Sequence, residues 1–344
     1  MRIALAAFLL FALPPVARAG VQEDWADILA LDSGPKKKPG SREEAVLLAR
    51  THIQLQRKVL EQFLARHPSD ERLFDARMRL AAILAAEGKM NKSPSQVDEA
   101  AILLGELEKT PGIPREKLAD AGFRRASLLM QSQIGSTDRM RESVLATVKA
   151  FLAKYPGDRR GPRLLVEAAT ICDDVPNLKR DLLNEALTLT TEEALKQRIA
   201  DDFKRLDLLG KPLTLTLSSV QAGPVDLAAL RGHVVVLIFW SAESPHSLLW
   251  LRDFRASWER MSKDSLRVVT ISLDENRRAL DERLRDLPAS WPTHFDGKGW
   301  NSPLARSLGI NALPTVWIID KKGVLRTINA RDSYETWIRQ LLRE

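Results

Sequence analysis

The sequence predicts an α-helical repeat domain followed by an α/β domain, in which a central mixed sheet is flanked by helices and preceded by a hairpin. Two observations support this division. Between residues 41 and 209, apolar residues recur at three- and four-residue spacing, the period of amphipathic helices. After residue 211, short apolar runs that suit buried strands alternate with helical segments. At 344 residues, the chain is long enough for two separate cores.

The first 19 residues have the composition of a secretory signal peptide. Arg2 precedes a short apolar run, and a small-residue cleavage site ends at Ala19. An uncleaved membrane anchor needs about 20 apolar residues, and this run is much shorter. We therefore expect cleavage after Ala19, no membrane span in the mature chain, and a periplasmic or secreted location.

Residues 20–40 are predicted to form an N-terminal arm or linker with at most one or two helical turns, because Gly, Pro and Lys follow one short apolar piece. The formal charge of +7 falls to +5 when Arg2 and Arg18 leave with the signal peptide. Acids and bases are interspersed along the rest of the chain, as on solvated helix faces. The three lysines at 36–38 lie between prolines and fit a linker, so no nucleic-acid partner is expected.

A motif recurs within the predicted helical domain, residues 41–209. The sequence Phe-Leu-Ala-Arg-His-Pro-Ser-Asp at 63–70 returns as Phe-Leu-Ala-Lys-Tyr-Pro-Gly-Asp at 151–158, with a weaker copy between them. The prolines of the three copies are 43 and 45 residues apart: Pro68, Pro111 and Pro156. A period in this range is typical of stacked helical hairpins. The expected helix pairs are 43–66 with 70–88, 96–109 with 114–132, 137–154 with 160–173, and 177–190 with 192–208.

This motif resembles the tetratricopeptide-like repeats of envelope proteins, although their Trp-x-x-Leu-Gly signature is absent. The resemblance implies a concave surface for a partner protein or peptide. The alternative is an array that packs its own helices and binds nothing.

The α/β domain is predicted over residues 211–344. Its expected elements are a hairpin of 213–217 with 225–227, a central strand at 234–238, a helix from 245 to 262, a strand at 266–274, a helix at 276–287, a short helix at 303–308, a strand after Pro314, a strand at 324–329 and a final helix at 333–342. A proline at the start of a strand indicates a sheet edge or a cis bond.

The central strand ends in Phe239-Trp240 and leads to Ser244, a helix cap, with Pro245 at the first helical position. This stretch resembles thioredoxin-like disulfide reductases of the TlpA/ResA type and the AhpC/TSA redoxin group, in which Trp-Cys-x-x-Cys opens the helix. The segments 313–315 (Leu-Pro-Thr) and 320–323 (Asp-Lys-Lys-Gly) resemble the same family. The resemblance implies a thioredoxin-like fold and a cis Leu313–Pro314 bond packed against the Ser244–Ser247 turn.

Both cysteine positions of the family motif hold serine here, Ser244 and Ser247. Thiol–disulfide exchange needs a thiolate nucleophile and a second thiol, and a serine hydroxyl supplies neither. Ile238 also stands where the family has a buried polar or acidic residue. We therefore expect no catalytic residues and no cofactor.

By resemblance, the degenerate active site is a groove for an extended polypeptide. Its predicted residues are Trp240, Ser244, Pro245, His246, Ser247, Leu313, Pro314 and Thr315. The alternative is that the groove is vestigial.

Other chemistry finds little support in the sequence. A hydrolase using Ser244 and His246 lacks an acid placed to orient the imidazole. The five histidines are scattered, without Cys or His at ligand spacing, so no metal site is expected. Cys172 is the only cysteine and lies in an apolar helical stretch; we expect a buried side chain, the alternative being a reactive thiol.

The sequence thus predicts a non-catalytic protein-binding or scaffolding role in the cell envelope. The expected partner is an envelope protein or peptide, bound by the helical repeats, by the thioredoxin groove or by both. The alternative is a redoxin-family thiol-disulfide oxidoreductase or peroxidase that works with thiols supplied by a partner.

Overall fold

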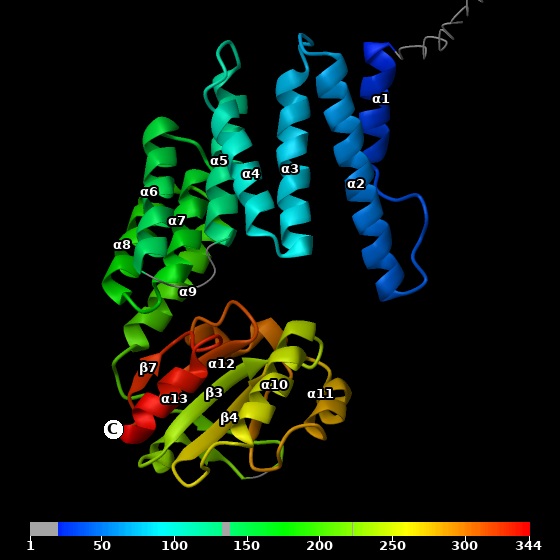
Figure 1. Cartoon of the computed structure of the whole chain (residues 1–344). Helices are drawn as coiled ribbons and strands as arrows, with labels where there is room; N and C mark the ends of the chain where they lie inside the picture. The colour runs from blue at the N-terminus through cyan, green and yellow to red at the C-terminus, as the bar shows by residue number, and fades with distance from the viewer. Residues whose placement is uncertain (1–19, 133–137, 222) are drawn as a thin grey trace, which may run out of the picture. The chain divides into compact units, whose positions relative to one another are not determined.

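The computed structural model describes residues 20–132, 138–221 and 223–344, so the predicted signal peptide lies outside the described residues. The chain divides into two compact units, residues 1–135 and residues 136–344, and Figure 1 shows it as a ribbon. The division falls within the predicted helical domain, and the helices after residue 136 belong to the same unit as the sheet. The domain limits 41–209 and 211–344 stay a prediction. Across the described ranges, no helix combines the length and apolar character needed to cross a membrane.

In the first unit, each helix packs against the next along the chain. Its helices are α1 (Val21–Leu31), α2 (Arg42–Arg66), α3 (Leu73–Asn91), α4 (Pro94–Leu107) and α5 (Arg115–Ser132). One apolar cluster joins α3, α4 and α5 and contains Phe74, Leu84 and Leu104. Within α3, the cluster residues Phe74, Met78, Ala81 and Leu84 recur at three- and four-residue spacing. Each helix therefore buries one face, and the predicted helix pairs are confirmed.

The segment after residue 20 corrects the prediction of an arm with at most one or two helical turns. It forms α1, an 11-residue helix whose Ile28 packs with Leu60 and Phe63 of α2. Asp24 on the same helix is buried, and His67 Nε2 donates to its carboxylate at 2.8 Å. Hydrogen bonds from His67 and then Arg66 hold the pKa of Asp24 below its usual value, against the opposing effect of burial. The helix forms because it buries an apolar face and a paired acid that local composition does not reveal.

In the described part of the second unit, four helices precede the sheet. They are α6 (Asp138–Lys154), α7 (Gly161–Ala169), α8 (Pro176–Leu189) and α9 (Glu193–Leu208), with a 3-10 turn η1 (Thr170–Cys172) after α7. The bounds agree with the predicted helix pairs to within a few residues, except that α7 ends early in the 3-10 turn.

The repeated motif forms the same turn in both copies. After α2, the carboxylate of Asp70 accepts the backbone N–H of Arg72 at 2.9 Å and its side-chain Nε at 2.7 Å. After α6, Asp158 accepts the same two groups of Arg160 at 2.9 and 3.0 Å. The arginine in each turn lowers the pKa of the aspartate, that of Asp70 to about 2. The two copies are therefore structurally equivalent, although 88 positions separate them.

The rest of the second unit is the predicted mixed sheet with flanking helices, and the thioredoxin-like fold class is confirmed. A two-stranded hairpin, β1 (Thr216–Leu217) with β2 (Val225–Asp226), precedes a sheet of order β5-β4-β3-β6-β7. The sheet strands are β3 (Val234–Trp240), β4 (Leu266–Ser272), β5 (Thr293–Phe295), β6 (Thr315–Ile319) and β7 (Leu325–Thr327). β3, β4 and β5 run parallel, and β6 is antiparallel to both β3 and β7. The helices are α10 (Pro245–Trp258), α11 (Arg277–Leu284), α12 (Pro303–Ser307) and α13 (Tyr334–Arg343), with 3-10 turns η2 (Leu227–Leu230) and η3 (Gly299–Asn301).

The central strand β3 is buried over all seven residues. One of its faces, including Val236 and Ile238, packs with Phe254 of α10 and Leu341 of α13. On another part of the strand, the ring of Phe239 lies 5.2 Å from that of Trp317 on β6. Burial of the whole strand explains its unbroken apolar run.

Candidate functional site

The candidate site forms where β3 ends and α10 begins. Phe239 pairs with Thr315 across the antiparallel β3–β6 ladder, so the start of β6 lies beside the end of β3. The peptide bond between Leu313 and Pro314 is cis, as predicted. The fold thus brings the proline segment, residues 313–315, next to the segment that follows Trp240.

Ser244 and Ser247 hold structural positions at the start of α10. Ser244 is the N-cap, and its hydroxyl oxygen accepts the backbone N–H of Ser247 at 3.2 Å. Ser247 is fully buried, and no hydrogen-bond partner of its hydroxyl lies in the described part of the chain. Ser244 therefore caps the start of the helix, and Ser247 is closed off from solvent.

The remaining predicted groove residues differ in exposure. Pro245 and His246 are exposed, Leu313 and Thr315 are half-buried, and Pro314 is buried. Trp240 is fully buried in the core, so its side chain offers no surface to a partner, contrary to its expected place in the groove wall. Trp240 is one of seven consecutive buried residues on β3, a strand that is covered on both faces.

The start of α10 offers few hydrogen-bond donors to a ligand. Pro245 has no N–H, the N–H of Ser247 is bound by Ser244, and that of Leu248 donates to the Ser244 carbonyl at 3.0 Å. Within the described residues, His246 has no hydrogen bond to either serine, so the groups needed for a serine hydrolase are not assembled. No group of three or more His, Cys, Asp and Glu side chains that could hold a metal occurs among them either.

A buried acid that the sequence analysis missed fixes the loop before α10. Asp274 follows β4 and is 2% exposed. Its carboxylate accepts hydrogen bonds from Ser241 Oγ at 2.7 Å, from Ser272 Oγ at 2.6 Å and from the backbone N–H of Ala242 at 2.9 Å. The sequence carried a signal for this acid, because Asp274 comes two residues after the end of β4. The carboxyl ends of the parallel strands β3 and β4 lie at the same end of the sheet, so Asp274 lies near the loop that follows β3. The loop before α10 therefore has a buried carboxylate partner.

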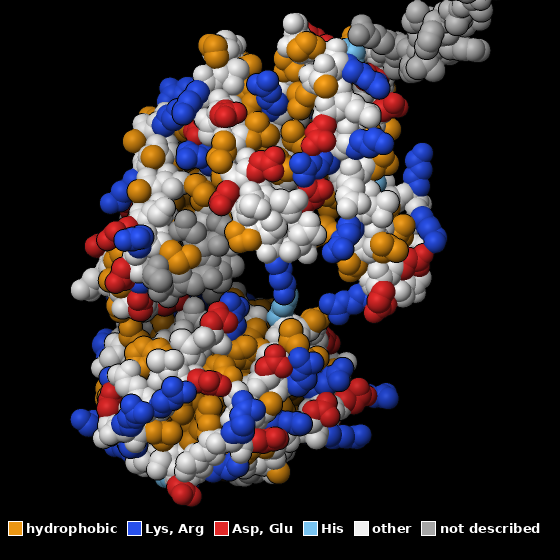
Figure 2. Space-filling model, in the orientation of Figure 1, with side chains coloured by type: hydrophobic (Ala, Val, Ile, Leu, Met, Phe, Trp, Pro, Cys, Tyr) orange, Lys and Arg blue, Asp and Glu red, His pale blue; other side chains and the backbone are white. Residues whose placement is uncertain are grey.

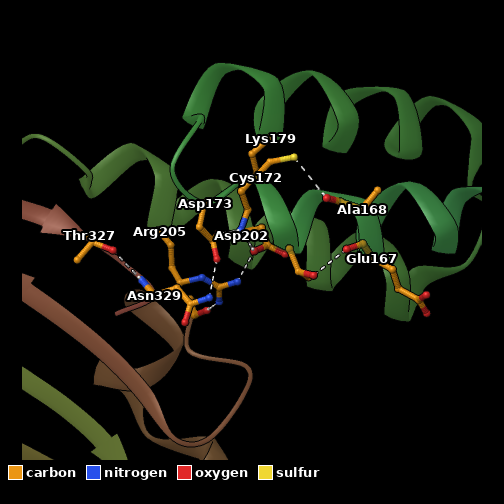
Figure 3. Close-up of polar contacts among 11 residues, drawn as sticks. Glu167, Ala168, Cys172, Asp173, Lys179, Asp202, Arg205, Thr327 and Asn329 are labelled. Atoms are coloured by element: carbon orange, nitrogen blue, oxygen red, sulfur yellow. Dashed lines mark hydrogen bonds and ion pairs between the residues drawn. The ribbon is translucent and has the colours of Figure 1, made fainter. Parts of the chain in front are cut away.

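A second buried polar group connects the helices of this unit to the α/β part. Figure 3 shows Lys179 of α8 with Asp173 and Asp202, and Arg205 of α9 with Asp202. Lys179, Asp202 and Arg205 are each less than one-tenth exposed. Asn329, which follows β7, donates to Asp173 at 2.6 Å. Two acids and two bases neutralise one another, which is the condition for burying charge.

The same arginine reaches the loop that carries the cis proline. Arg205 Nη1 donates to the carbonyl oxygen of Gly309, and Lys204 Nζ donates to that of Arg306 at 3.1 Å. Gly309 has a φ of +68° and packs so closely on α9 that a Cβ would collide with the Asp201 carbonyl. Residue 309 must therefore be glycine, both for its backbone conformation and for this contact.

The only cysteine lies beside this network and is not poised for reaction. Cys172 is fully buried, and its thiol donates to the carbonyl oxygen of Ala168 at 3.4 Å (Figure 3). Burial raises the pKa of the Cys172 thiol to about 11. A thiolate is therefore nearly absent at neutral pH, in agreement with the predicted buried side chain.

The first unit contains a separate candidate binding surface, a cavity of about 550 Å³ lined by α1, α2, α3 and α5. Its apolar lining includes Trp25, Ile28, Leu60, Phe74 and Met78. Each charged side chain of its rim has a partner of opposite sign: Asp32 with Arg79, Asp75 with Lys117, and Asp120 with Arg124. The cavity is therefore apolar inside and electrically balanced at its edge. Figure 2 shows acidic and basic side chains interspersed on each unit.

Comparison with known proteins concerns the C-terminal part. Residues 209–328 match the AhpC/TSA family. The chain is 21% identical over 115 residues to sporulation thiol-disulfide oxidoreductase A of Bacillus subtilis (strain 168). The aligned residues make up 33% of this chain and 67% of that protein. The C-terminal part is thus an AhpC/TSA thioredoxin-like domain after a helical region, in a chain with one cysteine and no Cys-x-x-Cys pair.

Two solved structures show similarities of the same extent. An uncharacterized thioredoxin-like protein from Bacteroides vulgatus is 20% identical, with a TM-score of 0.35, over 38% of this chain and 86% of that chain. A thiol-disulfide oxidoreductase from Bacteroides fragilis NCTC 9343 is 19% identical, with a TM-score of 0.31, over 37% of this chain and 96% of that chain.

Proposed function

We propose that this protein is a non-catalytic binding protein of the cell envelope that keeps a thioredoxin-like domain without its redox chemistry. The observation that carries the proposal is the use of the two serines at the start of α10. Ser244 caps the helix and Ser247 is buried, so neither position supplies a nucleophile. The single cysteine is buried with a raised thiol pKa. Relatives named as oxidoreductases share the scaffold, whereas exchange chemistry needs two reactive thiols.

We assign partner binding first to the cavity of the first unit. Its apolar lining gains free energy when it covers apolar side chains of a partner. Its rim has no surplus of either charge, so a highly charged segment gains little there. The best fit is an uncharged polypeptide segment with large apolar side chains, from an envelope protein or peptide. Export by the predicted signal peptide would bring the chain to such partners.

The protein should be silent in redox assays. Insulin reduction by dithiothreitol and peroxide consumption should each be no faster with the wild-type protein or with Cys172→Ala than without added protein. Dithiothreitol supplies thiols, so acceleration by the wild type would instead support the oxidoreductase that borrows its thiols from a partner. Loss of that acceleration in Cys172→Ala would assign it to Cys172.

A cysteine restored at Ser244 should regain the environment of a reactive thiol. In a Cys172→Ala background, the N-terminus of α10 is expected to lower the pKa of the Ser244→Cys thiol by about one unit below the usual 8.5. The pH dependence of iodoacetamide alkylation measures it. The control is Arg339→Cys on the exposed side of α13, whose thiol should keep an ordinary pKa.

The same two variants show whether the groove is used. If Ser244→Cys forms mixed disulfides with envelope proteins that Arg339→Cys does not capture, the groove still meets partners. Equal capture would mean a vestigial groove and leave the helical region as the binding surface. Equal alkylation pKa values would contradict the placement of Ser244 at the helix start.

A further inference from the structure

The two copies of the repeated turn share the residues that form it but carry opposite charges at two neighbouring positions. Asp70 and Arg72 in the first copy correspond to Asp158 and Arg160 in the second, and both copies form the same hydrogen bonds. Between and after these residues the copies differ. Glu71 is replaced by Arg159, and Asp75 is replaced by Arg163. The same turn is formed with acids or with bases at these two positions, so its hydrogen bonds require neither Arg159 nor Arg163.

An ion pair beside each turn is reversed in the same way. In the first copy, Asp75 at the start of α3 binds Lys117 at the start of α5, with 2.8 Å between Nζ and Oδ1. In the second copy, Arg163 in α7 binds Glu192 at the start of α9, with 2.7 Å between Nη2 and Oε1. Each pair joins the helix after the turn to the helix two further along. The acid and the base have changed places, and the connection is kept.

The second copy lies beside a cavity of about 370 Å³ with a basic lining. The lining residues are Arg159, Arg160, Arg163, Leu189, Thr190, Thr191 and Glu192. Three guanidinium groups face one carboxylate among these residues. Arg160 is held by Asp158 and Arg163 by Glu192. Arg159 is exposed and has no hydrogen-bond or ion-pair partner within the described ranges.

Other groups around this cavity also favour an anion. The exposed Thr191 carries a hydroxyl donor. Helix α9 starts at Glu193 without a side-chain cap, because the Glu192 carboxylate is directed to Arg163. The positive end of the helix macrodipole therefore adds to the field of the arginines. Arginine forks match carboxylate and phosphate oxygens in geometry as well as charge.

We propose that this basic cavity is a binding site for an anion with two or more negative charges, carried by several carboxylate groups or by a phosphate group. Arg159 supplies the free guanidinium, and Arg163 is shared between the ligand and Glu192. The site is distinct from both the apolar cavity of the first unit and the start of α10, and it does not depend on the absence of redox activity.

Isothermal titration of the full chain at low ionic strength tests the proposal, with citrate and inorganic phosphate as separate probes. We expect saturable binding of at least one probe, and its identity assigns the site to carboxylates, to phosphates or to both. Arg159→Glu introduces the residue of the first copy and should weaken binding at least tenfold. Glu192→Gln frees Arg163 and should tighten binding about threefold or more.

The matched control is Arg139→Glu, which makes the same charge change at an exposed position of α6 outside the cavity. It should alter affinity by less than twofold. Circular dichroism melts confirm that each variant is folded. Absence of saturable binding of both probes by the wild type would overturn the proposal. Equal weakening by Arg139→Glu and Arg159→Glu would also overturn it, since the effect would then come from net charge alone.

Discussion

Arg205→Ala is expected to lower the free energy of unfolding by about 3–5 kcal/mol, the usual cost of removing one member of a buried ion pair. The change leaves Asp202 without its arginine partner and the Gly309 carbonyl without its donor. Both groups lie where water reaches them poorly, so the lost interactions are not replaced. Urea unfolding followed by circular dichroism measures the effect.

Arg180→Ala is the matched control. Arg180 pairs with Asp207 at 2.7 Å between neighbouring helices of the same unit, but the two side chains are 41% and 61% exposed. An exposed pair of this kind contributes no more than about 1 kcal/mol. Similar losses in the two variants would show that the Arg205 network is not a buried anchor.

Asp274→Ala is expected to lower the free energy of unfolding by about 3 kcal/mol, because several buried donors lose the carboxylate that they share. Ser241, Ser272 and the Ala242 amide all donate to this carboxylate. Asp274→Asn keeps one oxygen acceptor, so its free energy of unfolding should lie between those of Asp274→Ala and the wild type. Urea unfolding gives the stabilities, and hydrogen exchange at the Ala242 amide shows whether the loop before α10 has opened.

Asp253→Ala is the control for Asp274. Asp253 pairs with Arg252 on the exposed side of α10. Its replacement by alanine should change the free energy of unfolding by no more than about 0.5 kcal/mol. If Asp274→Ala were equally mild and the Ala242 amide stayed protected, the carboxylate would not be what fixes the loop.

Apolar periodicity predicted most helices and strands because it reports directly which face of an element is buried. It predicted the helix pairs of residues 41–209 and the buried strand β3, and the resemblance around Pro314 predicted the cis bond. It did not predict α1, whose stability comes from packing on α2 and from the Asp24–His67 contact. Such partners lie 43 positions apart and leave no local pattern.

The candidate site was harder to predict for the same reason. The serines were identified from the motif, but the burial of Trp240 and Ser247 depends on how both sides of β3 are covered. Asp274 reaches the loop before α10 only through strand pairing. The contact of Arg205 with Gly309 joins residues 104 positions apart and could not be found without the fold.

The position of Trp25 gives the first unit an optical signal of its own. It is the only tryptophan before residue 240, and the other seven all belong to the second unit. Its indole lines the apolar cavity, with the guanidinium carbons of Arg72 and Arg79 at 5.4 and 5.7 Å from the ring centroid. A segment that enters the cavity displaces water from a ring whose emission colour depends on its surroundings. The fluorescence difference between wild type and Trp25→Phe therefore isolates events in the cavity, without an attached dye.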